Sequence, residues 1–294
     1  MSIVTPAFNQ AEYLVQTIES VLAQNYPRLE YIVLDDGSSD DTPAILARYE
    51  GRIRHERHAN VGQARTLNKG WKMARGSLIG YLSSDDCLHP QAVSRLVLTL
   101  ANRPDAMVAY CDFELIDAAG RAFRTVRTED YNAMRLHVDL VCQPGPGALF
   151  RREVFDLTGG WAEDLRQVPD FEFWLRASVL GCFVRVPEVL ANYRIHEESA
   201  SFAAAPAERS MEIVRVMEAY WEGQAGKKVG RSMAAAHLIA AKSHAQSGRL
   251  SASILQWLQA VSCQPATLWS PAAWRKLLSG LSRRAAYQIL RRGK

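Results

Sequence analysis

Two stretches of the chain, EYIVLDD at residues 30–36 and SLIGYLSSDD at residues 77–86, decide the fold. Each is a short apolar run that leads into a pair of aspartates. Runs this apolar are typical of strands buried on both faces, as in a parallel sheet covered by helices. The acidic pairs are therefore expected at the carboxyl edge of such a sheet, which is where open α/β folds bind ligands.

The two acidic pairs are Asp35-Asp36 and Asp85-Asp86. Adjacent carboxylates repel each other and lose hydration on burial, so packing alone gives no reason to keep them together. A divalent cation or a polar ligand gives one. For one pair taken alone the alternative is a helix N-cap or a turn, because aspartate is favoured in both. Two pairs in register on successive strands favour ligand binding.

Strand–helix units are expected from residue 4 to residue 112. Apolar residues at helical spacing predict a helix over residues 11–25, and Pro27 ends it before the next strand. Further helices are expected after Asp41-Thr42-Pro43 and across residues 60–74. This alternation predicts an α/β fold with a doubly wound, mostly parallel sheet and helices on both faces.

The rest of the chain has a different pattern. Residues 108–201 combine strands with the stiff, glycine-rich stretch 143–147. Beyond Pro206 the sequence is helical and rich in alanine, and residues 231–260 predict two packed helices broken near Gly248. We therefore expect a C-terminal α-helical appendage.

Composition limits the class of protein. The chain has 294 residues, 48% hydrophobic and 22% charged, as in soluble globular proteins. It contains no apolar run near the roughly 20 residues that a membrane span needs, and its start resembles no signal peptide. The first strand begins almost at Met1, so a shortened N-terminus stays open. The odd number of scattered cysteines, without a CxxC pair, predicts reduced thiols in a cytoplasmic protein: Cys87, Cys111, Cys142, Cys182 and Cys263.

Charge is divided unevenly along the chain. After Glu222 there is no acidic residue, whereas twelve lysines and arginines follow, so the net charge of +4 combines a negative body with a basic tail. From Trp269 to Lys294, apolar residues recur at helical spacing with arginines largely on the other side. This pattern is typical of a helix at an anionic membrane surface, and equally of a helix packed on the negative body. No nucleic-acid recognition motif is present.

Nine motifs in order along the chain resemble the family 2 glycosyltransferases, inverting enzymes of the GT-A fold, over about residues 3–201. The motifs are Thr5-Pro6-Ala7-Phe8-Asn9, Asp35-Asp36-Gly37-Ser38-Ser39-Asp40, Asn60-Val61-Gly62, Asn68-Lys69-Gly70, Ala74-Arg75-Gly76, Ser83-Ser84-Asp85-Asp86 in place of a DXD signature, Gly159-Gly160-Trp161, Asp170 with Trp174, and Tyr193-Arg194-Ile195-His196. The resemblance implies transfer of a sugar from a nucleoside-diphosphate sugar, most simply a UDP-sugar, to a glycan or lipid-linked glycan. It also implies a catalytic domain at 1–203, with a nucleotide-binding half (1–107) and an acceptor-binding half (108–203), before a basic helical region at 204–294.

The resemblance also implies roles for the acidic pairs. Asp86 would bind a divalent metal, Mn²⁺ or Mg²⁺, and Asp85 would contact the ribose or a metal-bound water. Asp36 would accept a hydrogen bond from the base ring, with Asp35 in support. Such a metal neutralises the charge that grows on the departing diphosphate. The wall beside the base would be formed by Thr5, Pro6 and Phe8.

Asp170 is the candidate general base. A carboxylate within reach of the acceptor hydroxyl removes its proton and typically contributes about 10²–10⁴-fold to the rate. Aromatic neighbours in residues 171–174 are expected to raise its pKa by desolvation. The alternative is a helix N-cap after Pro169, and both roles can hold at once. Family patterns usually have an acid at the position of Pro169.

Three further residues complete the candidate site. By the resemblance His196 faces the metal or the diphosphate, although a lone histidine is more often a surface or core residue. Arg194 and Arg65 match phosphate oxygens in chemistry, and solvated surface arginines are the alternative. Two other functions stay open, a nucleotidyltransferase and a catalytically inactive sugar- or nucleotide-binding module. The first lacks its usual glycine-rich basic loop here, and intact acids at positions 36, 86 and 170 disfavour the second.

Overall fold

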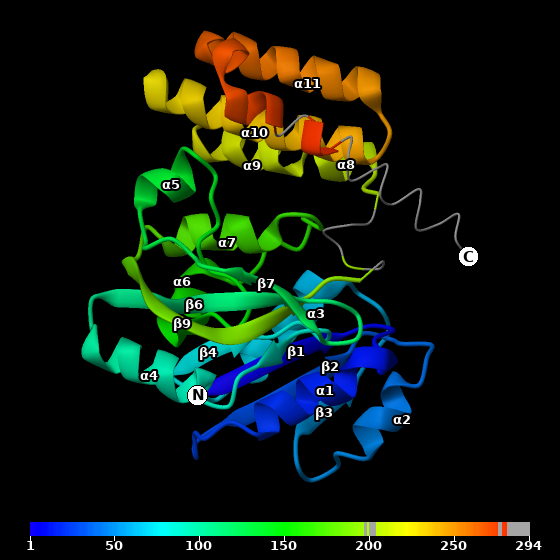
Figure 1. Ribbon diagram of the computed structural model, residues 1–294. Helices are drawn as coiled ribbons and strands as arrows, with labels where there is room; N and C mark the ends of the chain where they lie inside the picture. The colour runs from blue at the N-terminus through cyan, green and yellow to red at the C-terminus, as the bar shows by residue number, and fades with distance from the viewer. Residues whose placement is uncertain (197–198, 200–203, 276–277, 281–294) are drawn as a thin grey trace. The chain divides into compact units, whose positions relative to one another are not determined.

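The chain divides into two compact units, shown in a computed structural model that describes residues 1–196, 199, 204–275 and 278–280 (Figure 1). The first unit comprises Met1–Asn132 and Cys142–Ser199. The second comprises Ala133–Val141 and Ala200–Lys294. The sequence placed the boundary a few residues later, at 203–204, and did not indicate that residues 133–141 belong with the C-terminal helices.

The first unit is built on a nine-stranded sheet, counted over the described residues, with the order β3-β2-β1-β4-β8-β6-β9-β5 and with β7 paired to β6. Its strands are β1 Ser2–Ala7, β2 Glu30–Asp35, β3 Arg54–Arg57, β4 Leu78–Tyr81, β5 Cys87–Leu88, β6 Ala106–Ile116, β7 Ala122–Val126, β8 Leu149–Arg151 and β9 Cys182–Arg194. Its helices are α1 Ala11–Leu22, α2 Thr42–Ala47, α3 Gln63–Met73, α4 Ala92–Asn102, α6 Arg152–Thr158 and α7 Pro169–Ala177. The α/β class expected from the sequence is confirmed.

Most of the paired residues lie in parallel ladders, as expected, and the long pair of β6 with β9 is one of them, but antiparallel pairs join the two halves of the sheet. The N-terminal strands β3, β2, β1 and β4 run parallel to one another. Beyond them, β8 runs antiparallel to both β4 and β6, and β5 runs antiparallel to β9. The sheet is therefore mixed. An apolar run such as that of β8 predicts burial but does not encode the direction in which the strand runs.

Burial explains why the N-terminal half of the sheet is so apolar. Every residue of β1 is buried, and because successive side chains point to opposite faces, both faces are covered. Helix α1 buries Leu14, Ile18 and Val21 at helical spacing. Trp71 of α3 is completely buried, and its ring packs against Phe150 of β8 with centroids 5.2 Å apart. The Nε1 atom of Trp71 also donates to the carbonyl of Gly80 at 3.4 Å, which holds α3 against β4, the strand before the second acidic pair.

The two acidic pairs differ in how far along the chain they lie from the end of the preceding strand. Asp35 is the last residue of β2, as the sequence predicted. The strand β4 ends at Tyr81, so Asp85 and Asp86 lie in the connection between β4 and β5. The second pair is therefore carried by a short loop and not by the end of the strand itself.

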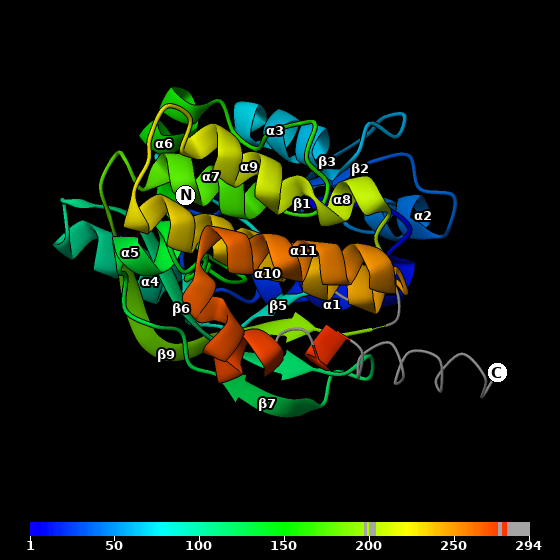
Figure 2. The same ribbon diagram turned by 90° about the horizontal axis from the view of Figure 1, so that it is seen from above.

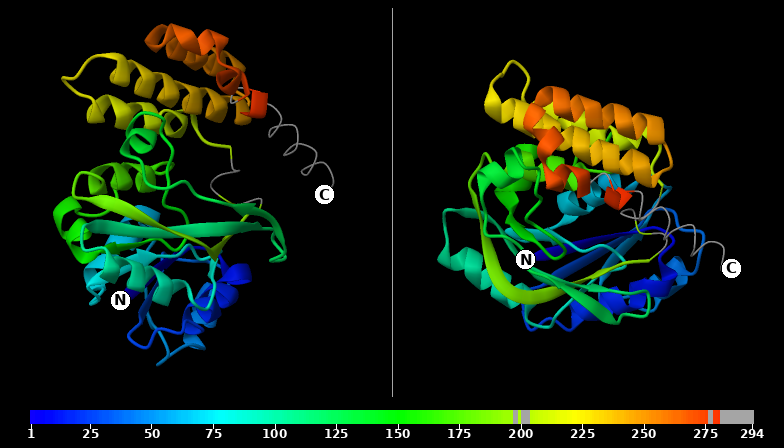
Figure 3. Two further views of the ribbon diagram at one scale, coloured as in Figure 1. Left: turned by 60° about the vertical axis from the view of Figure 1, so that its left-hand side comes forward. Right: turned by 45° about the horizontal axis from the view of Figure 1, so that its top comes forward.

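The second unit is helical. Its elements are α5 Ala133–His137, α8 Ala207–Ser210, α9 Glu212–Tyr220, α10 Lys227–Gln246, α11 Leu250–Cys263 and the 3₁₀ helix η1 Pro265–Trp269. Helices α10 and α11 run side by side (Figures 2 and 3) and meet at Gly248, whose φ of +81° favours glycine. The expected helix pair is confirmed.

The described residues contain no helix that is both long and apolar enough to cross a membrane. Most of the basic amphipathic helix expected from Trp269 to Lys294 lies outside those residues.

Candidate active site

The first acidic pair organises a loop at the carboxyl edge of the sheet. The Oδ1 atom of Asp36 accepts a hydrogen bond from the backbone N–H of Val61 at 2.7 Å, and Oδ2 accepts one from Gly62 at 2.9 Å. Asp36 is 3% exposed, so these bonds compensate for its lost hydration. The motif Asn60-Val61-Gly62 is thus tied to the motif of residues 35–40. Each oxygen keeps a second lone pair with which to accept a donor from a ligand.

Asp35 supports the same turn from inside the protein. Its Oδ1 atom accepts a hydrogen bond from the N–H of Ser38 at 2.9 Å, and its Oδ2 atom lies 3.3 Å from Nε of Arg57. Arg57 also donates to the carbonyl of Ser38 at 2.8 Å. Asp35 is completely buried, which suits the supporting role expected for it. Arg57, at the end of the edge strand β3, was missed from the sequence because its pairing is set by the strand register.

The wall expected beside the nucleobase is only partly available. Thr5 is completely buried, and its hydroxyl lies 3.1 Å from that of Tyr31. Its side chain therefore faces the core and presents no surface to a ligand, which corrects the expectation for Thr5. Pro6 is also buried, whereas Phe8 is 47% exposed just after β1. Of the three expected wall residues, Phe8 has the exposed ring.

The second acidic pair lies against the end of β9. Asp86 is 2% exposed, and its Oδ1 atom accepts a hydrogen bond from the N–H of Arg194 at 2.9 Å. The Oδ2 atom of Asp85 lies 3.0 Å from Nε2 of His196. The ring of His196 also packs on Tyr13 of α1, with centroids 4.7 Å apart. The structure thus brings together three residues that the sequence proposed for one site, although 110 positions separate Asp86 from His196.

Electrostatics make the second pair unusual. Burial, and then the neighbouring charge of Asp85, raise the pKa of Asp86 well above its ordinary value. The hydrogen bond and positive charge of Arg194 offset this only in part. A carboxylate that is costly to ionise in the free protein is one that a bound cation stabilises.

The pair fits a hard divalent cation. The described residues contain no group of three or more His, Cys, Asp or Glu side chains arranged to hold a metal. Mg²⁺ and Mn²⁺ do not require one, because they commonly bind one or two carboxylates and complete their coordination with water and substrate phosphates. Asp86 and Asp85 supply the carboxylate oxygens, and His196 contacts Asp85.

Arg194 has a different position from the one expected of a diphosphate ligand. It is 1% exposed, and all of its guanidinium N–H groups are engaged inside the protein. They donate to the carbonyls of Asp85, Asp117 and Ala118, to the side chain of Gln16 and weakly to Cys87. No donor is left for a phosphate, so this expectation is corrected: Arg194 positions the acidic loop. The sequence shows the arginine but not the carbonyls that surround it.

Arg65 is exposed, and its Nε atom forms an ion pair with Glu163 at 3.1 Å. An exposed pair of this kind is weak and can be exchanged for another anion. The diphosphate role of Arg65 therefore stays a prediction.

Asp170 lies in the first turn of α7, directly after Pro169. Desolvation by the surrounding protein raises the pKa of its carboxyl, while hydrogen bonds from the first amides of the helix lower it in part. The same carboxylate adds to the burial that raises the pKa of Tyr81 well above its usual value, and the charge of Asp86 adds to it too. Tyr81 therefore interacts electrostatically, through its hydroxyl, with both Asp170 and Asp86. It was missed as a site residue, although it is the last residue of β4.

Asn68 connects α3 to the loop before α7. Its Nδ2 atom donates to the carbonyl of Trp161 at 2.8 Å, and its Oδ1 atom accepts from the N–H of Trp161 at 2.8 Å. Gly160 has a φ of +92°, and a Cβ there would lie 2.3 Å from Asn68 Oδ1, so only glycine fits. Trp161 in turn packs on Tyr81 with centroids 5.0 Å apart. The motifs at 68–70 and 159–161 are thus one structural unit.

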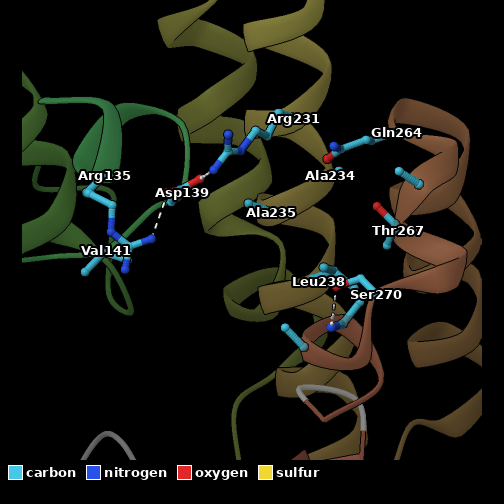
Figure 4. Close-up of a pocket in the computed structure, with 13 residues that line it drawn as sticks. Arg135, Asp139, Val141, Arg231, Ala234, Ala235, Leu238, Gln264, Thr267 and Ser270 are labelled. Carbon is cyan, nitrogen blue, oxygen red and sulfur yellow. Dashed lines mark hydrogen bonds and ion pairs between the residues drawn. The ribbon is translucent and has the colours of Figure 1, made fainter.

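The second unit contains a cavity of about 500 Å³ that does not belong to this site (Figure 4). Arg135 and Arg231 both pair with Asp139, at 2.8 and 2.5 Å. The remaining lining consists of five alanines, Leu238 and Val141, and the polar Gln264, Thr267 and Ser270. No residue expected in the site lines this cavity.

The mixed α/β sheet thus carries one acidic pair at a strand end and a second in the loop after strand β4, where the buried Asp86 is suited to a cation. Residues 2–158, more than half of the chain, match the family model of glycosyl transferase family 2. The chain belongs to this family.

Individual relatives agree with this assignment. The chain is 28% identical over 231 residues to an uncharacterized glycosyltransferase of Rickettsia prowazekii, covering 76% of this chain and 70% of that protein. It is 29% identical over 205 residues to chondroitin synthase of Escherichia coli, covering 68% of this chain but only 30% of that much longer protein.

Solved structures share the fold. Residues 1–349 of S. aureus TarS, in complex with UDP-GlcNAc, superpose with a TM-score of 0.67 at 16% identity, covering 100% of this chain and 92% of that chain. The mannosyltransferase PcManGT of Pyrobaculum calidifontis, in complex with GDP-Man and Mn²⁺, gives a TM-score of 0.62 at 17% identity over 98% and 86% of the two chains.

Proposed function

We propose that this glycosyltransferase is a metal-dependent, inverting enzyme that transfers a sugar from a nucleoside-diphosphate sugar to an acceptor hydroxyl. The observation that carries the proposal is the buried Asp86 beside Asp85, in a chain that belongs to glycosyl transferase family 2. A diphosphate with its metal supplies the positive charge and the ligand that this pair lacks.

The donor is proposed to bind across the first half of the sheet. Asp36 accepts a hydrogen bond from the base through the lone pairs that Val61 and Gly62 leave open, and Phe8 covers the base. A UDP-sugar is the first choice, since the TarS fragment is described in complex with UDP-GlcNAc, whereas PcManGT is described with GDP-Man. The side chain of Arg65 exchanges its ion pair with Glu163 for one with the diphosphate.

Asp86 and Asp85, with His196 beside them, are the residues proposed to hold Mn²⁺ or Mg²⁺. A bound divalent ion supplies Lewis-acid stabilisation of the diphosphate leaving group. His196 holds the carboxylate of Asp85 in place, and Arg194 holds the backbone of the same loop.

Asp170 is proposed to take the proton of the acceptor hydroxyl. The acceptor oxygen attacks the anomeric carbon on the face opposite the diphosphate, the new C–O bond forms, and the sugar–phosphate bond breaks with its electron pair going to the diphosphate. Attack from that face inverts the anomeric configuration. A raised pKa makes Asp170 a better base in its ionised form, because stronger proton affinity increases the driving force for proton transfer.

The acceptor is proposed to be a glycan or a lipid-linked glycan, assembled at the cytoplasmic face of the membrane for a cell-surface polysaccharide. Sequence similarity to chondroitin synthase supports a polysaccharide product. The twelve basic residues after Glu222 support work at an anionic lipid surface.

The test is release of nucleoside diphosphate from a panel of UDP-, GDP- and dTDP-sugars with Mn²⁺ and mixed glycan acceptors. One donor should turn over, and Asp170→Asn should lower kcat/KM by about 10²–10⁴-fold. Asp156→Asn, an exposed aspartate on α6, serves as the matched control and should leave turnover unchanged. Equal activity of Asp170→Asn and the wild type, with both proteins folded by circular dichroism, would remove Asp170 from the mechanism.

A further inference from the structure

The outer face of α11 is mostly aliphatic, interrupted by the exposed Ser251, Gln259 and Ser262. Leu250, Ile254 and Leu258 recur at every fourth position and form one stripe along the helix, and they are 47%, 56% and 53% exposed. Leu255 beside them is 53% exposed. The helix, LSASILQWLQAVSC, contains no charged residue.

The packed face of the same helix carries Ser253 and Gln256 beside the apolar Trp257 and Ala260. Ser253 is 2% exposed and donates to the carbonyl of Ala241 in α10 at 2.8 Å. Gln256 is 9% exposed, and its Oε1 atom lies 2.7 Å from Nδ1 of His237. An amphipathic helix in water normally keeps its large apolar side chains on the packed face, whereas α11 has them on both faces. The outer face of α11 is therefore suited to an apolar environment and not to water.

The residues after α11 also include exposed apolar side chains. Trp269, at the end of η1, is 83% exposed, and Leu268 beside it is 38% exposed. Tryptophan is enriched where an apolar phase meets water. In Figure 3 the other long helix, α10, lies along one side of α11, which agrees with the burial of Ser253 and Gln256 on that side.

Charge identifies the partner. No acidic residue occurs after Glu222, and the exposed residues of this part of the chain include Lys227, Lys228 and Arg275. A second copy docked through α11 would bring two such basic regions together, which Coulomb repulsion opposes. An anionic lipid surface offers both a hydrocarbon layer for the leucines and negative charge for the lysines and arginines.

We propose that α11 lies in the plane of an anionic membrane surface, with Leu250, Ile254, Leu255 and Leu258 inserted and Trp269 at the interface. At 1.5 Å per residue the 14-residue helix is about 21 Å long, which suits an interfacial helix and is too short to span. The inference deepens the lipid-linked acceptor of the proposed function, but it places the contact on α11 and requires none of the catalytic residues.

The test is co-sedimentation of the full chain with vesicles of phosphatidylcholine containing 30% phosphatidylglycerol. The double variant Ile254→Asp, Leu258→Asp should lower the partition coefficient by at least about tenfold, because it removes inserted apolar area and adds charge that the headgroups repel. The matched control is Leu98→Asp, Leu157→Asp, which changes leucines 54% and 69% exposed in the first unit and should bind as the wild type does.

Further variants separate the possible causes of a loss of binding. Ile254→Trp, Leu258→Trp should keep or strengthen binding, whereas a merely misfolded aspartate variant would show a lower melting temperature without vesicles. Arg283→Glu, Arg284→Glu tests the basic end of the chain and should weaken binding less than the α11 aspartates do. Nucleotide release with a soluble acceptor should be the same for all of them, so a failure of the transferase proposal remains distinct.

Three outcomes would overturn the inference. The α11 aspartate variant could bind vesicles as tightly as the wild type. It could convert a dimer to a monomer in light scattering with vesicle binding unchanged, which would make α11 a self-association face. Binding could also be equal on pure phosphatidylcholine and unaffected by salt, which would remove the electrostatic part of the argument.

Discussion

Two glycines with the same backbone conformation allow the contact between the first acidic turn and its loop to be measured. Gly37 and Gly51 both have a φ of +78°. A Cβ at Gly37 would lie 2.7 Å from the backbone nitrogen of Asn60 and 3.2 Å from the carbonyl of His58, whereas a Cβ at Gly51 would meet nothing within 4 Å. Alanine therefore strains both sites equally in φ but collides with a neighbour only at position 37.

The expected magnitudes follow from this difference. A left-handed conformation costs an alanine about 1–2 kcal/mol, of which about 0.4–1 kcal/mol is offset because alanine restricts the unfolded chain. Gly51→Ala should therefore lower the free energy of unfolding by no more than about 1.5 kcal/mol. Gly37→Ala should lower it by about 1–3 kcal/mol more, the usual cost of overpacking, because backbone atoms must move.

Urea denaturation of both variants measures the difference directly. Calorimetric titration with nucleoside diphosphate should also show weaker binding for Gly37→Ala and unchanged binding for Gly51→Ala, because the displaced loop carries the amides that bond to Asp36. Equal losses of stability in the two variants, with equal affinity for nucleotide, would mean that Gly37 is not needed for the close approach of the loop at residues 58–62.

Three further predictions concern single side chains. Arg194→Met should lower the free energy of unfolding, measured in urea, by about 3–5 kcal/mol, because it leaves buried carbonyls without donors. The exposed Arg52→Met should change it by less than about 1 kcal/mol. A loss below about 1 kcal/mol for Arg194→Met would contradict its positioning role. Burial raises the folded-state pKa of Asp170, so its stabilising contribution is present below the ordinary value of 3.8 and is lost as pH rises through the folded pKa. Asp170→Asn should therefore be more stable than the wild type near pH 7 and equal to it near pH 3, and thermal melts across this range that gave a constant difference would contradict the burial argument. Asn68→Ala should cost about 2–3 kcal/mol, since it removes two buried hydrogen bonds to Trp161, and it should also lower kcat/KM; unchanged values of both would mean that the loop needs no such support.

The parts of the fold that depend on local pattern could be predicted from the sequence. The apolar run at residues 30–34 and the acidic pair after it gave β2 and its carboxyl end. Alanine-rich helical spacing on either side of Gly248 gave α10 and α11, because a residue with positive φ ends a helix whatever surrounds it.

The parts that depend on distant contacts could not be predicted in this way. Strand direction reversed at β8 because burial does not encode polarity. Residues 133–141 joined the second unit through contacts such as that of Asp139 with Arg231, 92 positions away. Thr5 and Arg194 have the residue types of ligands, but their hydroxyl and guanidinium groups are used inside the protein. Only the three-dimensional neighbours distinguish a side chain that binds a ligand from one that positions a loop.

Calorimetric titration of UDP, GDP and dTDP into the protein, with and without Mn²⁺, tests the central claim most directly. One diphosphate should bind, and only in the presence of the metal; Asp86→Ala should abolish this binding, whereas the exposed Asp105→Ala should not. Failure of every diphosphate to bind the folded wild type, or metal-dependent binding that survives Asp86→Ala, would contradict the account.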